Sequence, residues 1–191
     1  VLVVTGWYDA EDLYGSFKTY QAIERLNPGV QNTLVVGPWH HGGWAGGDGE
    51  KLVDIAFGSK TSAFYRAEIE LPFFEKYLKD AEIPAPAEAT VFETGANAWR
   101  TFDAWPPKDA QRQMLYLQAG GQLGEAPPRA RAADGAFDEY VSDPARPVPS
   151  IEKIAPTMPI EYIVADQRFA ARRPDVLVYQ TRELTEDMLV A

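Results

Sequence analysis

The sequence predicts an α/β domain over residues 1–82 followed by a β-rich domain over residues 83–191. Two short apolar runs, 1–4 and 33–36, are separated by a segment with helical spacing. Strand, helix and strand in succession indicate neighbouring parallel strands joined by a right-handed crossover. After the proline-rich segment 83–87, the apolar runs become short and strand-like. This change of character places the domain boundary near residue 82.

Two helices are predicted in the first domain. From Leu13 to Leu26, apolar residues recur three or four positions apart, and Asn27-Pro28-Gly29 ends the pattern. From Ser62 to Lys79 the spacing is similar and predicts a second helix. Because Pro72 has no backbone N–H, we expect it to kink this helix or divide it in two.

Short strands are predicted throughout the second domain. The runs that carry this prediction are 90–93, 113–117, 161–164 and 175–179. Turn signals such as Gly120-Gly121 separate some of them, and proline-rich stretches separate others. This spacing is typical of a β-sandwich or barrel.

Composition narrows the class of protein. The net charge of −10 argues against a nucleic-acid partner, which needs a basic face. No apolar run approaches the ~18 residues of a transmembrane helix, so we expect no membrane partner. The chain contains no cysteine, which excludes disulfides and thiolate metal ligands.

An acid and a histidine follow the two predicted parallel strands. Asp9 ends Thr5-Gly6-Trp7-Tyr8-Asp9, and His41 ends Gly37-Pro38-Trp39-His40-His41. Reactive groups collect beyond the carboxyl ends of the strands in an open parallel sheet. Asp9 would then orient His41, which would relay a proton. The alternative is that Asp9 or Asp12 caps the helix and that both histidines are surface residues.

The order of acid and histidine matches the last two members of the Ser–Asp–His triad of α/β-hydrolases. The first member is missing, because no Gly-x-Ser-x-Gly occurs. The serines present, none in the strand-turn-helix context of a nucleophile, are Ser16, Ser59, Ser62, Ser142 and Ser150. We therefore expect the nucleophile and oxyanion hole to lie upstream in a longer protein, and this piece alone to be inactive.

The glycine-rich segment 42–49 has some likeness to a phosphate-binding loop. It lacks the Lys-Ser/Thr that follows in a P-loop and contains acids, so we predict a loop beside His41. His40, His41 and Asp48 do not predict a metal site, because adjacent histidines seldom point the same way.

Together, the acid and histidine motifs resemble those of the X-Pro dipeptidyl-peptidase/cocaine esterase class of serine hydrolases. The histidine motif of that class, Gly-Pro-Trp-x-His, selects His41 over His40. The resemblance implies the C-terminal part of an α/β-hydrolase domain (1–82) followed by the N-terminal part of a jelly-roll domain (83–191). The later stretches that carry it are Trp99-Arg100, Trp105-Pro106-Pro107, Ser142-Asp143-Pro144, Asp166-Gln167-Arg168 and 173–179.

Within this class, the sequence is most similar to the α-amino acid ester hydrolases, which also acylate β-lactam nuclei. Their pattern Asp-x-Glu-Asp reads Asp9-Ala10-Glu11-Asp12 here. The resemblance therefore implies that Glu11 and Asp12 bind the α-ammonium group of the substrate. A partly desolvated ammonium gains most from several fixed carboxylates. The alternative is that these acids only favour the start of a helix through its dipole.

The resemblance implies a serine hydrolase or acyltransferase for α-amino acid esters and β-lactam amides, with neither cofactor nor metal. The partners implied are a small-molecule substrate, the rest of the polypeptide and further copies of it. Location would be periplasmic or secreted, with the cytoplasm left open.

Several alternatives remain open. In the same class, they are an X-Pro dipeptidyl peptidase, a cocaine-esterase-like hydrolase and a glutaryl-cephalosporin acylase. Glu11 and Asp12 count against the last of these, because a glutaryl group is anionic. Outside the enzymes, the alternative is a jelly-roll binding module, which leaves residues 1–82 unexplained.

Overall fold

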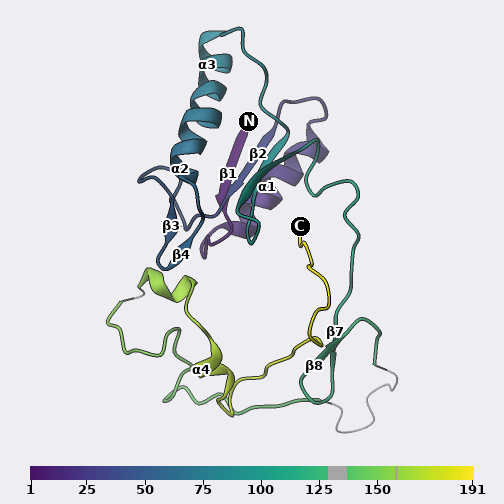
Figure 1. Cartoon of the computed structure of the whole chain (residues 1–191). Coiled ribbons are helices and arrows are strands. Elements are labelled where there is room, and N and C mark those ends of the chain that lie inside the picture. The colour runs from purple at the N-terminus through teal and green to yellow at the C-terminus, as the bar shows by residue number, and fades with distance from the viewer. Residues whose placement is uncertain (129–136, 158) are drawn as a thin grey trace. The chain divides into compact units, whose positions relative to one another are not determined.

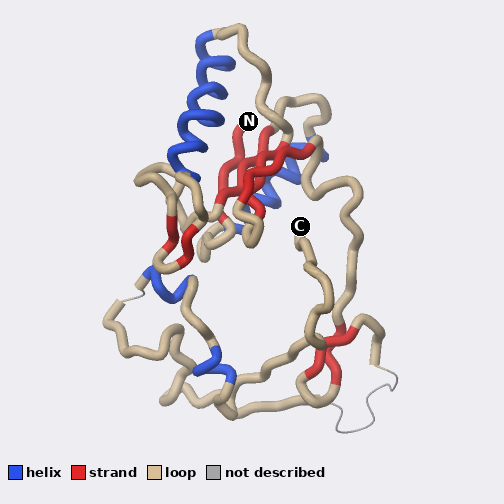
Figure 2. Tube along the Cα trace, in the orientation of Figure 1, coloured by secondary structure: helices blue, strands red, loops and turns tan. Residues whose placement is uncertain are grey.

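A four-stranded sheet organises the first part of the chain in the computed structural model (Figures 1 and 2). Its strand order is β1-β2-β5-β6. β1 (Leu2–Gly6) and β2 (Thr33–Gly37) are parallel neighbours, joined through α1 (Leu13–Leu26). The predicted strand-helix-strand unit is therefore confirmed, and α1 has the predicted bounds.

β2 is covered on both faces of the sheet, which explains why all five of its residues are buried and its centre, residues 34–36, is apolar. Alternate residues of a strand point to opposite faces. Leu34 and Val36 pack with Tyr20 of α1, whereas Val35 packs with Tyr65 and residues near it on the other face. The strand that precedes His41 is therefore held from both sides.

The second predicted helix is divided into three segments. They are α2 (Thr61–Phe64), the π-helical η1 (Tyr65–Glu70) and α3 (Leu71–Lys79). The wide turn of η1 comes just before Pro72. In an α-helix, the Pro72 ring would clash with the carbonyl of Glu68, and the π-helical turn avoids this contact. The helix changes type before Pro72 but stays continuous from residue 61 to residue 79, so the expected division into two separate helices does not occur. A short hairpin of β3 (Lys51–Leu52) and β4 (Ile55–Ala56) lies between β2 and α2.

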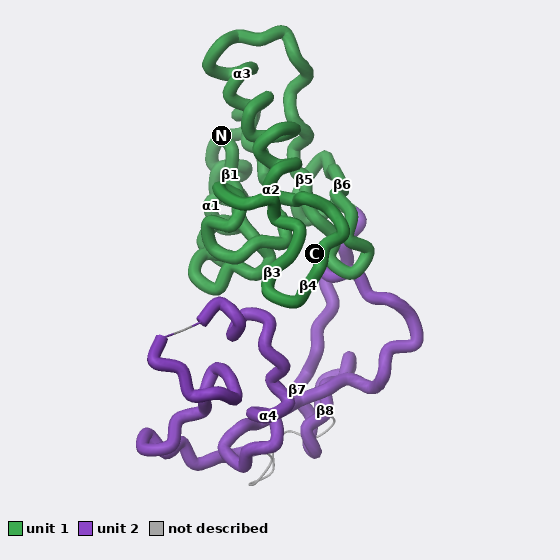
Figure 3. Tube along the Cα trace, turned by 60° about the vertical axis from the view of Figure 1, so that its left-hand side comes forward, with its two compact units in different colours: residues 1–108 green, residues 109–191 purple. Residues whose placement is uncertain are grey.

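The predicted domain boundary near residue 82 is corrected by the pairing of β5 (Ala89–Glu93). β5 lies parallel to β2, and β6 (Ala98–Phe102) follows it as an antiparallel neighbour. The proline-rich segment 83–87 therefore leads back into the first sheet. The first compact unit ends at Lys108, and the second covers Asp109–Ala191 (Figure 3). Within them the structure describes residues 1–128, 137–157 and 159–191.

The second unit contains β7 (Tyr116–Gln118) and β8 (Gln122–Gly124), which form an antiparallel hairpin. Gly120 and Gly121 make its turn with φ values of 75° and 71°, as the turn signal predicted. β7 overlaps the expected strand 113–117 only at its end. The remaining elements are η2, a 3₁₀-helix (Ile160–Ile163), and α4 (Arg168–Ala171).

Two predicted strands in this unit are wrong. Residues 161–164 lie largely in the 3₁₀-helix, and residues 175–179 form no ladder. In these runs Leu177 and Val178 stay exposed, because no sheet covers them within the described residues. The jelly roll expected over 83–191 is therefore wrong for residues 83–108, which belong to the first unit, and stays a prediction from the resemblance for the rest. None of the helices in the described ranges has the length and apolar character needed to cross a bilayer.

Candidate active site

The loops that follow β1 and β2 are held together by their backbones. The Trp7 N–H donates to the Gly37 carbonyl at 2.9 Å, and the Tyr8 N–H donates to the Trp39 carbonyl at 3.0 Å. Gly6 is needed for this approach, since a Cβ there would lie 2.1 Å from the Trp39 carbonyl oxygen. The two motifs singled out in the sequence therefore leave the sheet side by side.

Trp39 anchors the histidine loop in the core. Its indole packs against Tyr65 and Trp99, and its Nε1 donates to the buried Thr61 hydroxyl at 2.9 Å. A Cβ on Gly37 would lie 2.5 Å from the indole, so glycine leaves room for the ring. Gly6 and Gly37, one in each motif, therefore both allow close packing around Trp39.

Asp9 and His41 meet at the ends of β1 and β2. Nδ1 of His41 lies 3.1 Å from Oδ2 and 3.3 Å from Oδ1 of Asp9. The Asp9 side chain is 1% exposed and the His41 side chain 49% exposed. The predicted contact and the choice of His41 over His40 for it are confirmed. With Nδ1 on the carboxylate, Nε2 is the ring nitrogen available for proton transfer.

Backbone amides fix the Asp9 carboxylate. Its Oδ1 accepts the N–H groups of Glu11 and Asp12, both at 2.9 Å. Burial alone would raise the pKa of Asp9, but these two amides, followed by the hydrogen bond and charge of His41, outweigh it and lower the pKa. Asp9 is therefore a fixed anion beside the imidazole.

The pKa of His41 is raised above its ordinary value. The hydrogen bond to Asp9 is the largest cause, and the Asp9 charge is the next. The charges of Glu11 and Asp12 raise it further, which places both carboxylates within electrostatic range of the imidazole. The site therefore stabilises the imidazolium form, as a general base requires after it has accepted a proton.

Glu11 and Asp12 lie exposed in the turn between β1 and α1. Asp12 occupies the N-cap position of α1, yet its side chain makes no capping hydrogen bond. Glu11 lies before the helix, so neither acid belongs to its first turn. Within the described residues, neither carboxylate accepts a hydrogen bond or forms a salt bridge. Asp12 therefore does not cap α1 through its side chain, and neither acid lies in the first turn, where the helix dipole would favour it.

Trp44 lies next to the predicted site, although it stands outside the two motifs. Its ring is edge-on to the His41 imidazole at 6.3 Å between centroids. The Trp44 carbonyl in turn accepts a hydrogen bond from Arg66. Trp44 is a tryptophan within a glycine-rich segment close to His41, and this position in the sequence was a signal for the contact with the imidazole. Arg66 lies 22 residues further along the chain, and no local pattern indicated it.

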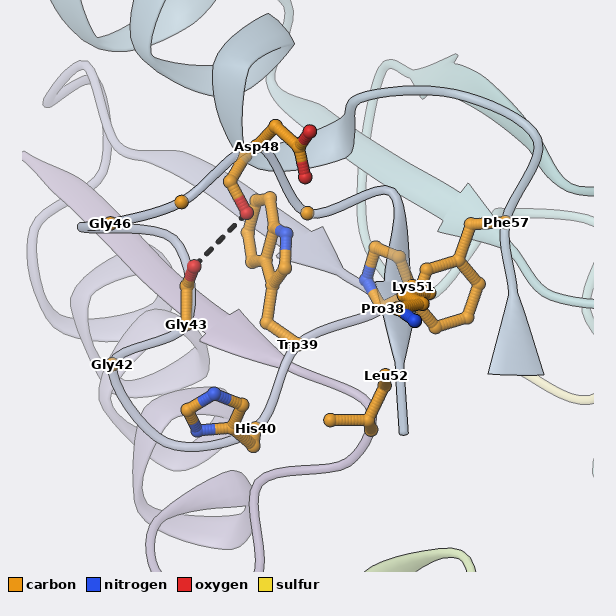
Figure 4. A pocket seen from close by; sticks show the side chains of 13 residues that line it. Pro38, Trp39, His40, Gly42, Gly43, Gly46, Asp48, Lys51, Leu52 and Phe57 are labelled. Carbon is orange, nitrogen blue, oxygen red and sulfur yellow. Dashed lines mark hydrogen bonds between the residues drawn. The ribbon is translucent and has the colours of Figure 1, made fainter. Parts of the chain in front are cut away.

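A cavity of about 460 Å³ lies on the His40 side of the histidine loop (Figure 4). Trp39, Asp48 and Phe57 are among its lining residues, whereas Asp9 and His41 are not. This cavity is therefore separate from the Asp9–His41 contact. No group of three or more histidine, aspartate or glutamate side chains suited to a metal occurs within residues 1–128, 137–157 and 159–191.

An acid and a histidine at the ends of neighbouring parallel strands define the acid–histidine part of an α/β-hydrolase. No known family profile matches the chain. It is 29% identical to a cocaine esterase from Rhodococcus sp. (strain MB1 Bresler), over 99% of this chain and 33% of the relative.

Two solved structures are similar over 97% of this chain and 31% of their own. An aminopeptidase from a marine sediment archaeon, Thaumarchaeota archaeon, has 41% identity and a TM-score of 0.84. An α-amino acid ester hydrolase labelled with selenomethionine has 36% identity and a TM-score of 0.81. The chain is a homologue of hydrolases of the X-Pro dipeptidyl-peptidase/cocaine esterase class, and spans about a third of the length of these relatives.

Proposed function

We propose that the full-length protein is a serine hydrolase that cleaves α-amino acid esters and transfers their acyl groups to β-lactam amines. The observation that carries this proposal is the contact of a buried carboxylate with Nδ1 of His41 at 3.1 Å. The similarity to an ester hydrolase and an esterase supports the reaction class. The serine would come from a part of the protein outside these 191 residues.

The proposed reaction has two steps. Nε2 of His41 accepts the serine proton while the serine oxygen bonds to the acyl carbon, and Asp9 stabilises the resulting imidazolium. His41 then gives the proton to the leaving alcohol as the ester C–O bond breaks, which leaves an acyl-enzyme. In the second step, water (for hydrolysis) or a β-lactam amine (for acyl transfer) bonds to the acyl carbon while His41 accepts its proton. His41 then returns this proton to the serine oxygen as the bond between the acyl carbon and the serine oxygen breaks.

We propose that Glu11 and Asp12 select substrates with a free α-ammonium group. Both carboxylates are exposed, and both act electrostatically on His41. Neither is occupied by a hydrogen bond or salt bridge within the described residues. Carboxylates in this state can bind an ammonium through charge-assisted hydrogen bonds.

The double substitution Glu11→Gln and Asp12→Asn should lower kcat/KM for an α-amino ester while nearly sparing the des-amino analogue. Loss of one charge-assisted hydrogen bond costs about 1.5–3 kcal/mol, roughly 10- to 150-fold. The measurement is kcat/KM for both esters in the full-length protein. Asp80→Asn with Glu82→Gln makes the same charge change at exposed positions of the same unit. An unchanged ratio between the two esters would leave a serine esterase without amino-ester selectivity.

The pH dependence of kcat/KM provides a separate test. His41 accepts a proton only when neutral, so its raised pKa should place the acidic limb above the ordinary histidine value of about 6.5. Removing the charges of Glu11 and Asp12 lowers the pKa of His41, so the acidic limb should move to lower pH. The des-amino ester is the substrate for this measurement, because binding of an ammonium does not affect it. A shift to higher pH would contradict the assignment.

A peptidase that acts at the N-terminus of peptides is the second candidate. The similarity to an aminopeptidase favours it, and the same carboxylates would bind the ammonium of a peptide N-terminus. Comparing an α-amino ester with free and N-acetylated peptides, including X-Pro peptides, distinguishes the two functions. Hydrolysis of free peptides at rates above those of the ester would favour the peptidase. Export and self-association stay predictions from the resemblance.

A further inference from the structure

The loop between His41 and α2 is rich in glycine. Gly42, Gly47 and Gly49 have positive φ values of 72°, 60° and 73°. Glycine loses more conformational freedom on folding than any other residue. A loop of this composition does not hold its own conformation, so it does not by itself fix the position of His41, which directly precedes it. Contacts from elsewhere in the chain must do so.

Arg66 supplies the most extensive of these contacts. Its Nη1 donates to the carbonyls of Trp44 and Gly46 at 2.9 and 3.3 Å, and its Nη2 donates to that of Gly47 at 2.6 Å. Across the described ranges, Arg66 forms no salt bridge with a carboxylate. The planar, forked guanidinium can reach several carbonyls at once, which a lysine ammonium cannot do with the same geometry.

The residues just before Arg66 hold the same loop. The Ser62 hydroxyl donates to the Gly43 carbonyl at 3.0 Å, as the dashed line in Figure 4 shows. The Thr61 hydroxyl donates to the Gly49 carbonyl at 2.7 Å. Segment 61–66, at the start of the helix before Pro72, is therefore bonded to carbonyls along the whole loop.

The link from Arg66 to His41 runs through Trp44. Arg66 fixes the Trp44 carbonyl, and the Trp44 ring lies edge-on to the His41 imidazole and packs on the anchored Trp39 indole. The imidazole thus touches Asp9 through Nδ1 and Trp44 through its ring. Movement of Trp44 would leave the half-exposed His41 side chain with Asp9 alone to orient it.

We propose that Arg66 is a positioning residue for His41, acting through the backbone of the loop 42–49 and the Trp44 ring. It touches neither the imidazole nor Asp9, and its contribution is to keep Nδ1 on the carboxylate. The inference rests on the proposed function, because the effect on turnover exists only if His41 is the general base.

The test compares Arg66→Ala and Arg66→Lys in the full-length protein. A displaced base should lower kcat by about 10- to 100-fold for Arg66→Ala, with KM changed by less than about threefold. Arg66→Lys, which keeps the charge and part of the hydrogen bonding, should lose less. Because His41 held less firmly by Asp9 has a lower pKa, the acidic limb of kcat/KM should move to lower pH. Arg168→Ala, which removes an exposed arginine of the second unit, is the control and should change none of these.

A double-mutant test separates positioning from general stabilisation. In a His41→Ala background, adding Arg66→Ala should leave the residual rate within about twofold, because there is no imidazole to misplace. Suppose that the wild-type protein is active and that His41→Ala is inactive. Arg66→Ala with unchanged kcat and an unchanged pH profile would then overturn the positioning role of Arg66, while the proposed hydrolase function would still hold.

The positioning role of Arg66 can be tested even if the protein is inactive or Arg66→Ala does not fold. If the wild-type protein hydrolyses no ester or peptide, the proposed function fails. The His41 pKa measured by NMR in wild type and Arg66→Ala then still decides the positioning role, and an unchanged pKa overturns it. If Arg66→Ala does not fold, kcat, KM and the pH profile are measured on Arg66→Lys and Trp44→Leu instead.

Discussion

Replacing His41 with alanine should lower kcat of the full-length protein by about 10⁴- to 10⁶-fold, because the members of a catalytic triad act as a unit. His41 is the histidine whose Nδ1 meets the buried Asp9 carboxylate. Its loss removes the group that would accept the serine proton and return it to the leaving group. The measurement is steady-state kcat with an α-amino ester, alongside a circular dichroism spectrum that reports folding.

His40→Ala is the matched control for this substitution. His40 lines the separate cavity. The histidine that is hydrogen-bonded to Asp9 is His41, and His40 makes no hydrogen bond to this carboxylate. We expect this variant to keep most of the activity, with any loss appearing in thermal stability. Similar losses from both variants would show that the general base has been assigned wrongly.

Replacing Asp9 with asparagine should lower kcat by about 10⁴-fold while leaving the fold intact. The asparagine oxygen can still accept the backbone N–H groups of Glu11 and Asp12 that Oδ1 accepts now. The amide nitrogen then faces Nδ1 of His41 and donates to it. This stabilises the tautomer with the proton on Nε2, which is the nitrogen that must accept the serine proton.

The same variant should move the acidic limb of kcat/KM to lower pH. The hydrogen bond and charge of Asp9 are the two largest causes of the raised His41 pKa, and asparagine removes the charge. Asp80→Asn, at an exposed position of the same unit that is not among the causes of the His41 shift, controls for a general effect of charge. An Asp9→Asn variant with activity within about tenfold of wild type would contradict the assigned role of the carboxylate.

The sequence was sufficient to predict the features that depend on local spacing. The helix from Leu13 to Leu26 follows from its apolar periodicity and its Asn-Pro-Gly ending. The contact between Asp9 and His41 follows from parallel strands with carboxyl ends at one edge. These interactions are set within about 40 residues by pattern and chain direction alone.

Features set by distant pairing were not predictable in this way. β5 resembles a strand of any sheet, and only its parallel pairing with β2 shows which one it joins. Residues 161–164 are apolar enough for a strand, but the described part of the second unit offers them no partner. The Arg66 contact likewise depends on how a helix lies against a loop, which periodicity does not encode.

The way Asp9 is held has a consequence for how enzymes of this kind diversify. Glu11 and Asp12 hold the Asp9 carboxylate with their main-chain N–H groups, while their side chains extend into solvent. Almost any residue at these two positions supplies the same N–H groups. Under the proposed function, the side chains that select the substrate can therefore change without loss of the main-chain hydrogen bonds that hold Asp9. Substitutions at positions 11 and 12 would then leave the Asp9 carboxylate in place and reach the catalytic pair only through the charge that they remove near His41.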